Sequence, residues 1–130
     1  MNQLQTSIVP TLSVSNGEAL VEFYKKAFNA QELMRIEGAD GLAVAELMVD
    51  GARFFIADAS PEHGNLSPVS AGGVTARMAL LVANPDEVAE RAVAAGALLL
   101  YPVADQDYGY RLGAIKDPAG HIWEICRKLE

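Results

Sequence analysis

One order of structural elements can be read twice along this chain, and that repetition restricts the possible folds more than any other feature. In the first module, residues 7–14 are rich in the apolar and β-branched side chains typical of a strand, and residues 18–28 carry apolar side chains along one helical face. Residues 31–35, 42–49 and 52–58 follow as three strand-like segments. The first module therefore reads as a βαβββ unit.

A loop at residues 59–73, rich in glycine, serine and proline, separates this unit from the next and is either a linker or a flap over a site. Asn84 is then placed to cap a second helix, which Gly96 ends. The strand-like segments of this second module are residues 74–82, 97–103, 108–116 and 120–127. The second module is also a βαβββ unit.

The two modules match residue by residue. Leu12, Val14, Asn16 and Ala27 correspond to Leu80, Val82, Asn84 and Ala95 at one constant offset, although short alternating strands can resemble one another by chance. The repetition predicts an α+β fold of two βαβββ modules, at about residues 7–58 and 74–128.

Local signals support these boundaries. Asn16 or Ser15 is suited to cap the first helix, and Asn29 to end it in a left-handed conformation. Asp50 and Gly51 are suited to a two-residue type I′ turn between adjacent strands.

Length and charge narrow the class of protein. A chain of 130 residues is expected to form one domain, 1–130, around a single core. The formal net charge is −7 and basic residues do not cluster, which argues against nucleic acid and anionic membranes as partners. No apolar stretch approaches the roughly 18 residues that span a bilayer.

The single cysteine, Cys126, excludes a disulfide within the chain and a metal site built from several thiolates. The first residues lack the basic and apolar regions of a secretory signal. Both observations lead us to expect a cytoplasmic protein.

The C-terminal stretch DPAGHIWEIC, residues 117–126, resembles the closing hairpin and strand of the vicinal oxygen chelate superfamily, which includes glyoxalases, bleomycin-resistance proteins and dioxygenases. LSVSN at residues 12–16 resembles that superfamily's first strand, and the similarity covers essentially the whole chain. Pro102, Asp105, Tyr108, Gly109, Arg111 and Gly113 further resemble a subgroup found near phosphonate-utilisation genes. The resemblance implies that the two modules form an inward-curved mixed sheet around a small-molecule cavity, usually in a homodimer.

Enzymes of the superfamily hold one divalent metal ion at four strand positions, which match Val9, Phe55, Arg77 and Glu124. Valine and phenylalanine carry no donor atom, and arginine keeps its proton. A single carboxylate binds a divalent cation weakly, so no metal cofactor is expected. A divalent metal remains the alternative.

We expect Arg77 to pair with Glu124 in place of the metal, since a buried carboxylate needs a partner. The competing interpretation is that Arg77 is solvated and water satisfies Glu124. Replacing Arg77 with methionine distinguishes the two, because losing a buried partner costs roughly 3–5 kcal/mol and a surface change almost nothing.

Tyr108, Tyr110 and Arg111, with Asp105 and Asp107, form a polar and aromatic cluster that could contact a ligand at the cavity mouth. Arg111 could bind an anionic group and the aspartates a cationic one. Packing is the competing role for the tyrosines. His63, His121 and Cys126 have no visible catalytic partner, and a carboxylate beside Cys126 would raise the pKa of its thiol.

Three functions remain open. The first is a small-molecule-binding dimer, of the kind that sequesters an antibiotic, with a cavity lined by the residues above. The second is a metal-dependent lyase, isomerase or dioxygenase. The third is metal-free catalysis with Glu124 as a base.

Overall fold

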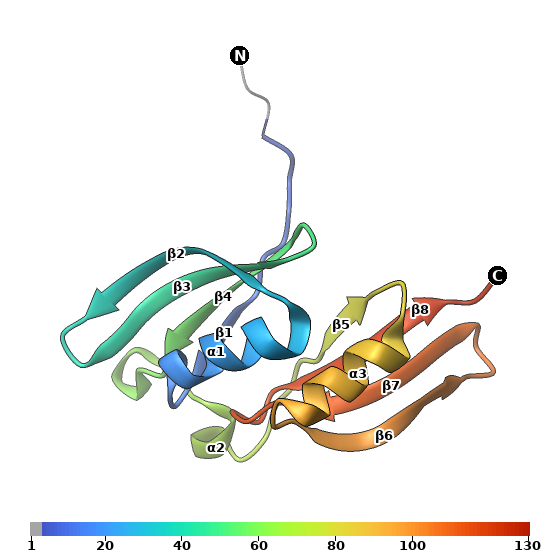
Figure 1. The fold of residues 1–130 in the computed structure, drawn as a ribbon. Coiled ribbons are helices and arrows are strands. Elements are labelled where there is room, and N and C mark those ends of the chain that lie inside the picture. Colours follow the sequence, from blue (N-terminus) through green and yellow to red (C-terminus); the bar gives the residue numbers. More distant parts are fainter. Residues whose placement is uncertain (1–3) are drawn as a thin grey trace.

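The computed structural model describes residues 4–130 and contains two four-stranded sheets with helices packed against them (Figure 1). The elements of the first module are β1 (Thr11–Val14), α1 (Gly17–Phe28), β2 (Gln31–Gly38), β3 (Gly41–Val49) and β4 (Ala52–Asp58). Those of the second module are β5 (Met78–Leu81), α3 (Pro85–Ala94), β6 (Leu98–Asp105), β7 (Tyr110–Lys116) and β8 (Ile122–Lys128). A short 3₁₀ helix, η1 (Pro61–His63), and a single helical turn, α2 (Pro68–Ala71), lie in the connecting loop.

The two sheets have the same topology. The strand order is β1-β4-β3-β2 in the first and β5-β8-β7-β6 in the second. In each sheet the first strand runs parallel to the last, and the other pairs are antiparallel. The predicted α+β fold of two βαβββ modules is therefore confirmed.

The helix caps repeat between the modules as well. The side chain of Asn16 accepts a hydrogen bond from the Ala19 amide, and that of Asn84 accepts one from the Glu87 amide, each at 3.2 Å. Each asparagine thereby satisfies an amide of the first helical turn that has no partner within the helix. Of the two caps considered for the first helix, Asn16 is the one used.

Two predicted backbone conformations are also present. Asn29 ends α1 with a φ of 56°, in the left-handed region. Asp50 and Gly51 both have positive φ, at 50° and 92°, as a type I′ turn requires. A two-residue turn of this type fixes the register of β3 against β4.

Four strands begin at least two residues later than predicted, β1 and β5 by four residues each and β7 and β8 by two. Regular pairing of β1 begins at Thr11 rather than residue 7, and that of β5 at Met78 rather than residue 74. Pro10 has no amide hydrogen, although its carbonyl still accepts a hydrogen bond from Phe55 at 2.8 Å. Strand β6 instead continues past Pro102, which an edge strand tolerates because its outer amides are unpaired.

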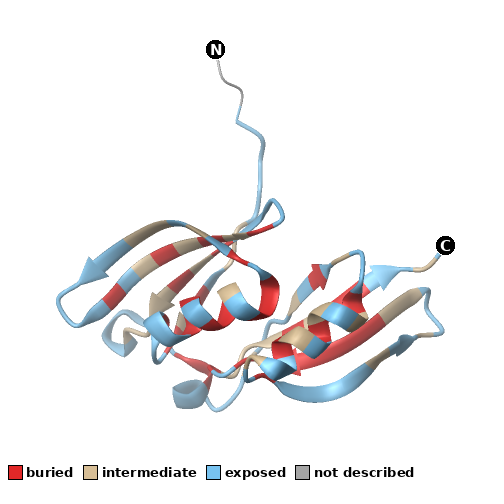
Figure 2. Cartoon of the chain, in the orientation of Figure 1, coloured by how far each residue is buried: buried red, intermediate tan, exposed pale blue. Residues whose placement is uncertain are grey.

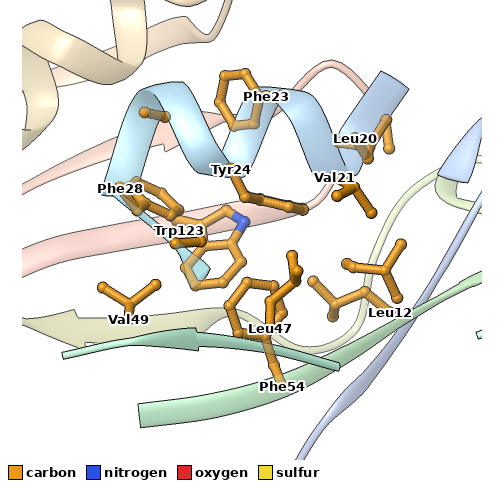
Figure 3. Packing of buried hydrophobic residues seen from close by; sticks show 14 of the residues in the cluster. Leu12, Leu20, Val21, Phe23, Tyr24, Phe28, Leu47, Val49, Phe54 and Trp123 are labelled. Atoms are coloured by element: carbon orange, nitrogen blue, oxygen red, sulfur yellow. The ribbon is translucent and has the colours of Figure 1, made fainter. Parts of the chain in front are cut away.

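The helix-covered faces of the two sheets contribute to one buried hydrophobic cluster (Figures 2 and 3). Tyr24 of α1 contacts both Phe54 of the first sheet and Trp123 of the second, at ring-centroid distances of 5.2 and 5.5 Å. Phe54 and Trp123 also contact each other directly, at 5.2 Å. Because these rings project from the helix-covered sides of their strands, those two sides face each other across the cluster.

A buried carboxylate joins the two modules beside this cluster. Asp117, in the turn between β7 and β8, accepts hydrogen bonds from the Tyr24 hydroxyl and, at 3.0 Å, from the Trp123 indole N–H. Its other oxygen accepts the amides of Ala119 and His121, each at 3.0 Å. Burial and the Asp117 charge raise the pKa of the Tyr24 hydroxyl well above its usual value, so Tyr24 stays a proton donor.

Gly113 allows the backbone of β7 to lie close to the backbone of β6. A Cβ atom added at Gly113 would lie 2.7 Å from the Val103 amide nitrogen and 2.9 Å from the Pro102 carbonyl carbon. Because both obstacles are backbone atoms, replacing Gly113 with alanine should lower the free energy of unfolding by about 1–3 kcal/mol. Chemical denaturation measures this, and an unchanged stability would contradict the packing described.

No helix within residues 4–130 is long and apolar enough to cross a membrane.

Candidate ligand-binding face

The faces of the two sheets that are turned away from the hydrophobic cluster carry most of the predicted site residues, with Arg111 as the exception. On β8, Trp123 and Ile125 are buried in the cluster, so Glu124 and Cys126 project to the opposite side. Residues paired directly across strands project to the same side. We call this side the outward face of each sheet.

The predicted ion pair lies on the outward face of the second sheet. Arg77, the residue before β5, donates from Nε to Glu124 Oε2 at 3.1 Å. The Arg77 side chain is 62 % exposed and that of Glu124 is 21 % exposed. The pairing is as predicted, but the arginine is solvated to a greater extent than a buried partner would be.

Replacing Arg77 with methionine should therefore have a small effect on stability. Exposed ion pairs contribute about 0–1 kcal/mol, because water screens the attraction. We expect the free energy of unfolding to fall by less than about 1 kcal/mol in urea denaturation. A loss of several kcal/mol would instead show that the guanidinium group is the buried partner first expected.

Tyr101 of β6 belongs to the same face. Tyr101 pairs with Ala114 of β7. Glu124 of β8 pairs with Ala114 on one side and with Ala79 of β5 on the other. These four residues form one row across the sheet. Burial and the nearby Glu124 carboxylate raise the pKa of the Tyr101 hydroxyl. Tyr108 also raises this pKa, whereas the positive charge of Arg77 lowers it.

Two of the predicted tyrosines extend this face. Tyr110 is paired with Lys128 and alternates with Leu112 and Ala114 on the same side of β7. The rings of Tyr108 and Tyr110 lie 6.4 Å apart between centroids. Tyr108 is exposed in the turn between β6 and β7. The face thus combines aromatic rings with an ion pair.

Arg111, the third member of the predicted cluster, lies on the other side of the sheet. Its guanidinium group donates to both carboxylate oxygens of Asp86 in α3, at 2.8 and 2.7 Å, and to Asp105 at 3.0 Å. These hydrogen bonds raise the pKa of Arg111 far above its usual value. Arg111 therefore links α3 to the sheet in this structure.

The first-module positions, Val9 and Phe55, belong to the other sheet. Val9 is half-buried and precedes β1, whereas Phe55 pairs with Thr11 and Glu46 and points away from the cluster. Within one chain, the structure brings Arg77 and Glu124 together but places Phe55 on a separate outward face.

Glu46 was missed by the sequence reasoning. It lies beside Phe55, on the strand next to the position where the resemblance implies a ligand. Its carboxylate forms an ion pair with Arg53 of β4 at 2.6 Å, and the two side chains are 17 % and 47 % exposed. Each outward face therefore carries one glutamate paired with a more exposed arginine.

These residues fit a metal ion poorly. Glu124 and Glu46 are on different sheets, and each is already paired with an arginine. Within residues 4–130, no three histidine, cysteine, aspartate or glutamate side chains are grouped so as to hold a metal ion. A divalent cation needs several oxygen, nitrogen or thiolate donors at one point, which these positions do not supply.

The surroundings of Cys126 and His121 favour structural roles for both residues. Burial, together with the Glu124 carboxylate, raises the pKa of the Cys126 thiol, so the reactive thiolate is disfavoured. The imidazole Nε2 of His121 lies 2.9 Å from the Ser13 carbonyl oxygen and so links β8 to β1. His63 is exposed in the connecting loop, with Nδ1 2.6 Å from the Ser60 hydroxyl.

Tyr101 was also missed by the sequence reasoning. Tyr101 directly follows an apolar run, Leu98 to Leu100, and such a run indicates hydrophobic packing and not ligand binding. Strand β6 has register shifts on both sides of Tyr101, so simple alternation from Leu98 does not give its orientation.

Two βαβββ modules with matching strand order define an α+β protein of the glyoxalase type. The model of the Glyoxalase/Bleomycin resistance protein/Dioxygenase superfamily matches residues 6–125, and the chain belongs to this superfamily. The resemblance found in the sequence is thereby confirmed at the level of the superfamily.

The chain is similar to a curated protein of unassigned function and to several solved structures. An uncharacterized protein of Mycobacterium bovis is 33 % identical over 126 residues, covering 94 % of this chain and 83 % of that protein. A glyoxalase-related enzyme from Fulvimarina pelagi has a TM-score of 0.69 at 29 % identity, over 96 % of this chain and 89 % of that one.

One solved structure with the same fold contains a metal ion. A mutant of the fosfomycin resistance protein FosX from Listeria monocytogenes, complexed with Mn(II) and 1S,2S-dihydroxypropylphosphonic acid, has a TM-score of 0.68 at 18 % identity. The alignment covers 94 % of this chain and 89 % of that one, and at this identity it shows the shared fold alone.

Proposed function

We propose that this protein binds a small organic molecule on the outward face of its second sheet, without a metal ion. The observation that carries the proposal is the Arg77–Glu124 ion pair, which occupies two of the positions where the resemblance implies metal ligands. The tyrosine rings beside the pair supply apolar surface and hydroxyl groups, which together are typical of ligand sites. We also propose a cytoplasmic location, which suits a single buried cysteine.

We further propose that two chains assemble into a homodimer that completes the cavity. The helix-covered faces of the two sheets face each other, so the outward faces point away from one another within one chain. Strands β1 and β5 each pair on one side only and leave an edge for a second copy. The outward face of the partner's first sheet would then close the cavity with the partner's Phe55 and the partner's Val9.

Ligand-induced stabilisation tests the binding function. A compound that binds the folded protein raises its melting temperature, so a library of small organic compounds is screened by thermal shift. We expect Tyr101→Ala to reduce the shift produced by the best compound. Val69→Ala, in the exposed turn α2, is the control and should retain it.

Two outcomes would contradict the proposal. One is the absence of any stabilising compound, and the other is an equal loss of the shift in both variants. Light scattering tests the assembly separately, and a monomer at micromolar concentration would contradict the dimer.

A further inference from the structure

Positive charge is concentrated on the outward face of the second sheet, although the chain as a whole has a formal net charge of −7. Lys128 pairs with Tyr110 and Lys116 pairs with Ile122, so both lysines project to the side of Glu124. Arg77 projects to this side as well, because it bonds Glu124. The strands of this face thus carry three cations and one carboxylate, while Asp107 lies beyond them in the turn before β7.

Neither lysine is engaged by a carboxylate. Within residues 4–130, no ion pair involves Lys116 or Lys128. Arg77 uses Nε for Glu124, and its two Nη groups have no other hydrogen-bond partner in the described part of the chain. The donors on this face therefore remain available to a ligand.

The strand register places these donors in a definite arrangement. Lys116 pairs with Ile122, and Arg77 precedes Met78, which pairs with Trp123. Extending this register by one residue sets Arg77 beside Ile122, about two strand spacings, roughly 10 Å, from Lys116. The adjacent row contains Ala79, Glu124, Ala114 and Tyr101. Ala79 and Tyr101 of this row are exposed, whereas Ala114 between them is buried.

We infer that this face binds an organic anion with a planar aromatic body. The inference rests on the proposed binding function and specifies its ligand class. The anionic group lies between Arg77 and Lys116, where charge-assisted hydrogen bonds are available. The aromatic body packs against the exposed ring of Tyr101 on β6, the strand next to that of Lys116.

Two probes that share a ring system but differ in charge test this ligand class. Isothermal titration calorimetry compares naphthoate with naphthylmethylammonium on the whole protein, since the two share a ring system and their charged groups are of opposite sign. We expect naphthoate to bind more tightly, and Lys116→Gln to weaken it roughly threefold or more through loss of one nearby charge.

Lys128→Gln is the matched control. It removes the same charge from the same face, but its position, beside Tyr110, lies roughly 20 Å along β7 from Lys116. We expect Lys128→Gln to change the naphthoate affinity by less than about twofold, because charges separated by more than a Debye length are largely screened.

The results separate this inference from the function on which it rests. Tighter binding of naphthylmethylammonium, or equal effects of the two lysine substitutions, would overturn the anion site while leaving a small-molecule-binding protein. If neither probe binds, the anion site is overturned, and if no library compound stabilises the protein either, the proposed function fails with it.

Discussion

Replacing Asp117 with alanine should lower the free energy of unfolding by roughly 3–5 kcal/mol, because four buried or half-buried donors lose their acceptor together. The carboxylate receives the Tyr24 hydroxyl, the Trp123 indole N–H and two amides of its own turn. Tyr24 belongs to the first module and Trp123 to the second. Loss of Asp117 should therefore weaken both the turn and the contact between modules. Urea denaturation followed by circular dichroism measures the change.

Tyr24→Phe separates these contributions. This variant keeps the ring in the cluster and removes only its hydroxyl, so a loss of about 1–2 kcal/mol is expected. If Asp117→Ala destabilises the protein by less than about 1 kcal/mol, the carboxylate does not have the role that its four hydrogen bonds indicate.

Replacing Trp123 with alanine should also remove roughly 3–5 kcal/mol of stability, since truncating a buried tryptophan leaves a large cavity. The ring lies within 5.0–5.5 Å, between centroids, of Tyr24, Phe28 and Phe54. These three partners belong to the first module, so we expect the packing of the modules to loosen as well as the core. Circular dichroism is the suitable probe, because Trp123 is the single tryptophan of the chain.

Trp123→Phe is the conservative comparison. It retains an aromatic ring but loses the hydrogen bond to Asp117, so its cost should be clearly smaller than that of alanine. Equal destabilisation by phenylalanine and alanine would show that the indole N–H, and not the packed ring, accounts for the effect.

Most of the secondary structure could be predicted because its causes are local. Asn16 and Asn84 cap their helices through amides three residues away, and Asp50 and Gly51 form a turn from their own dihedral preferences. The contact between modules is different. The pairing of Phe54 with Trp123 joins residues far apart in sequence, and no local pattern specifies which sheet faces meet.

The candidate site could be predicted only in part. Arg77 and Glu124 were predicted as a pair because both match cavity-facing positions that the resemblance to the superfamily implies. Tyr101 was missed because register shifts in β6 interrupt that alternation. The partners of Arg111 lie partly in α3, and a helix that packs across a sheet leaves no signal in the strand sequence. The phosphonate-associated subgroup stays a prediction.

We propose that this member of the superfamily binds its ligand through side chains and not through a metal ion. Metal content by mass spectrometry, on protein purified without an affinity tag and then titrated with Ni²⁺, Zn²⁺ and Mn²⁺, tests it most directly. We predict substoichiometric metal and only weak binding in each titration, since Glu124 is paired with Arg77 and the matching positions lack donors. One tightly bound metal ion per chain would contradict the account and favour a metal-dependent lyase, isomerase or dioxygenase.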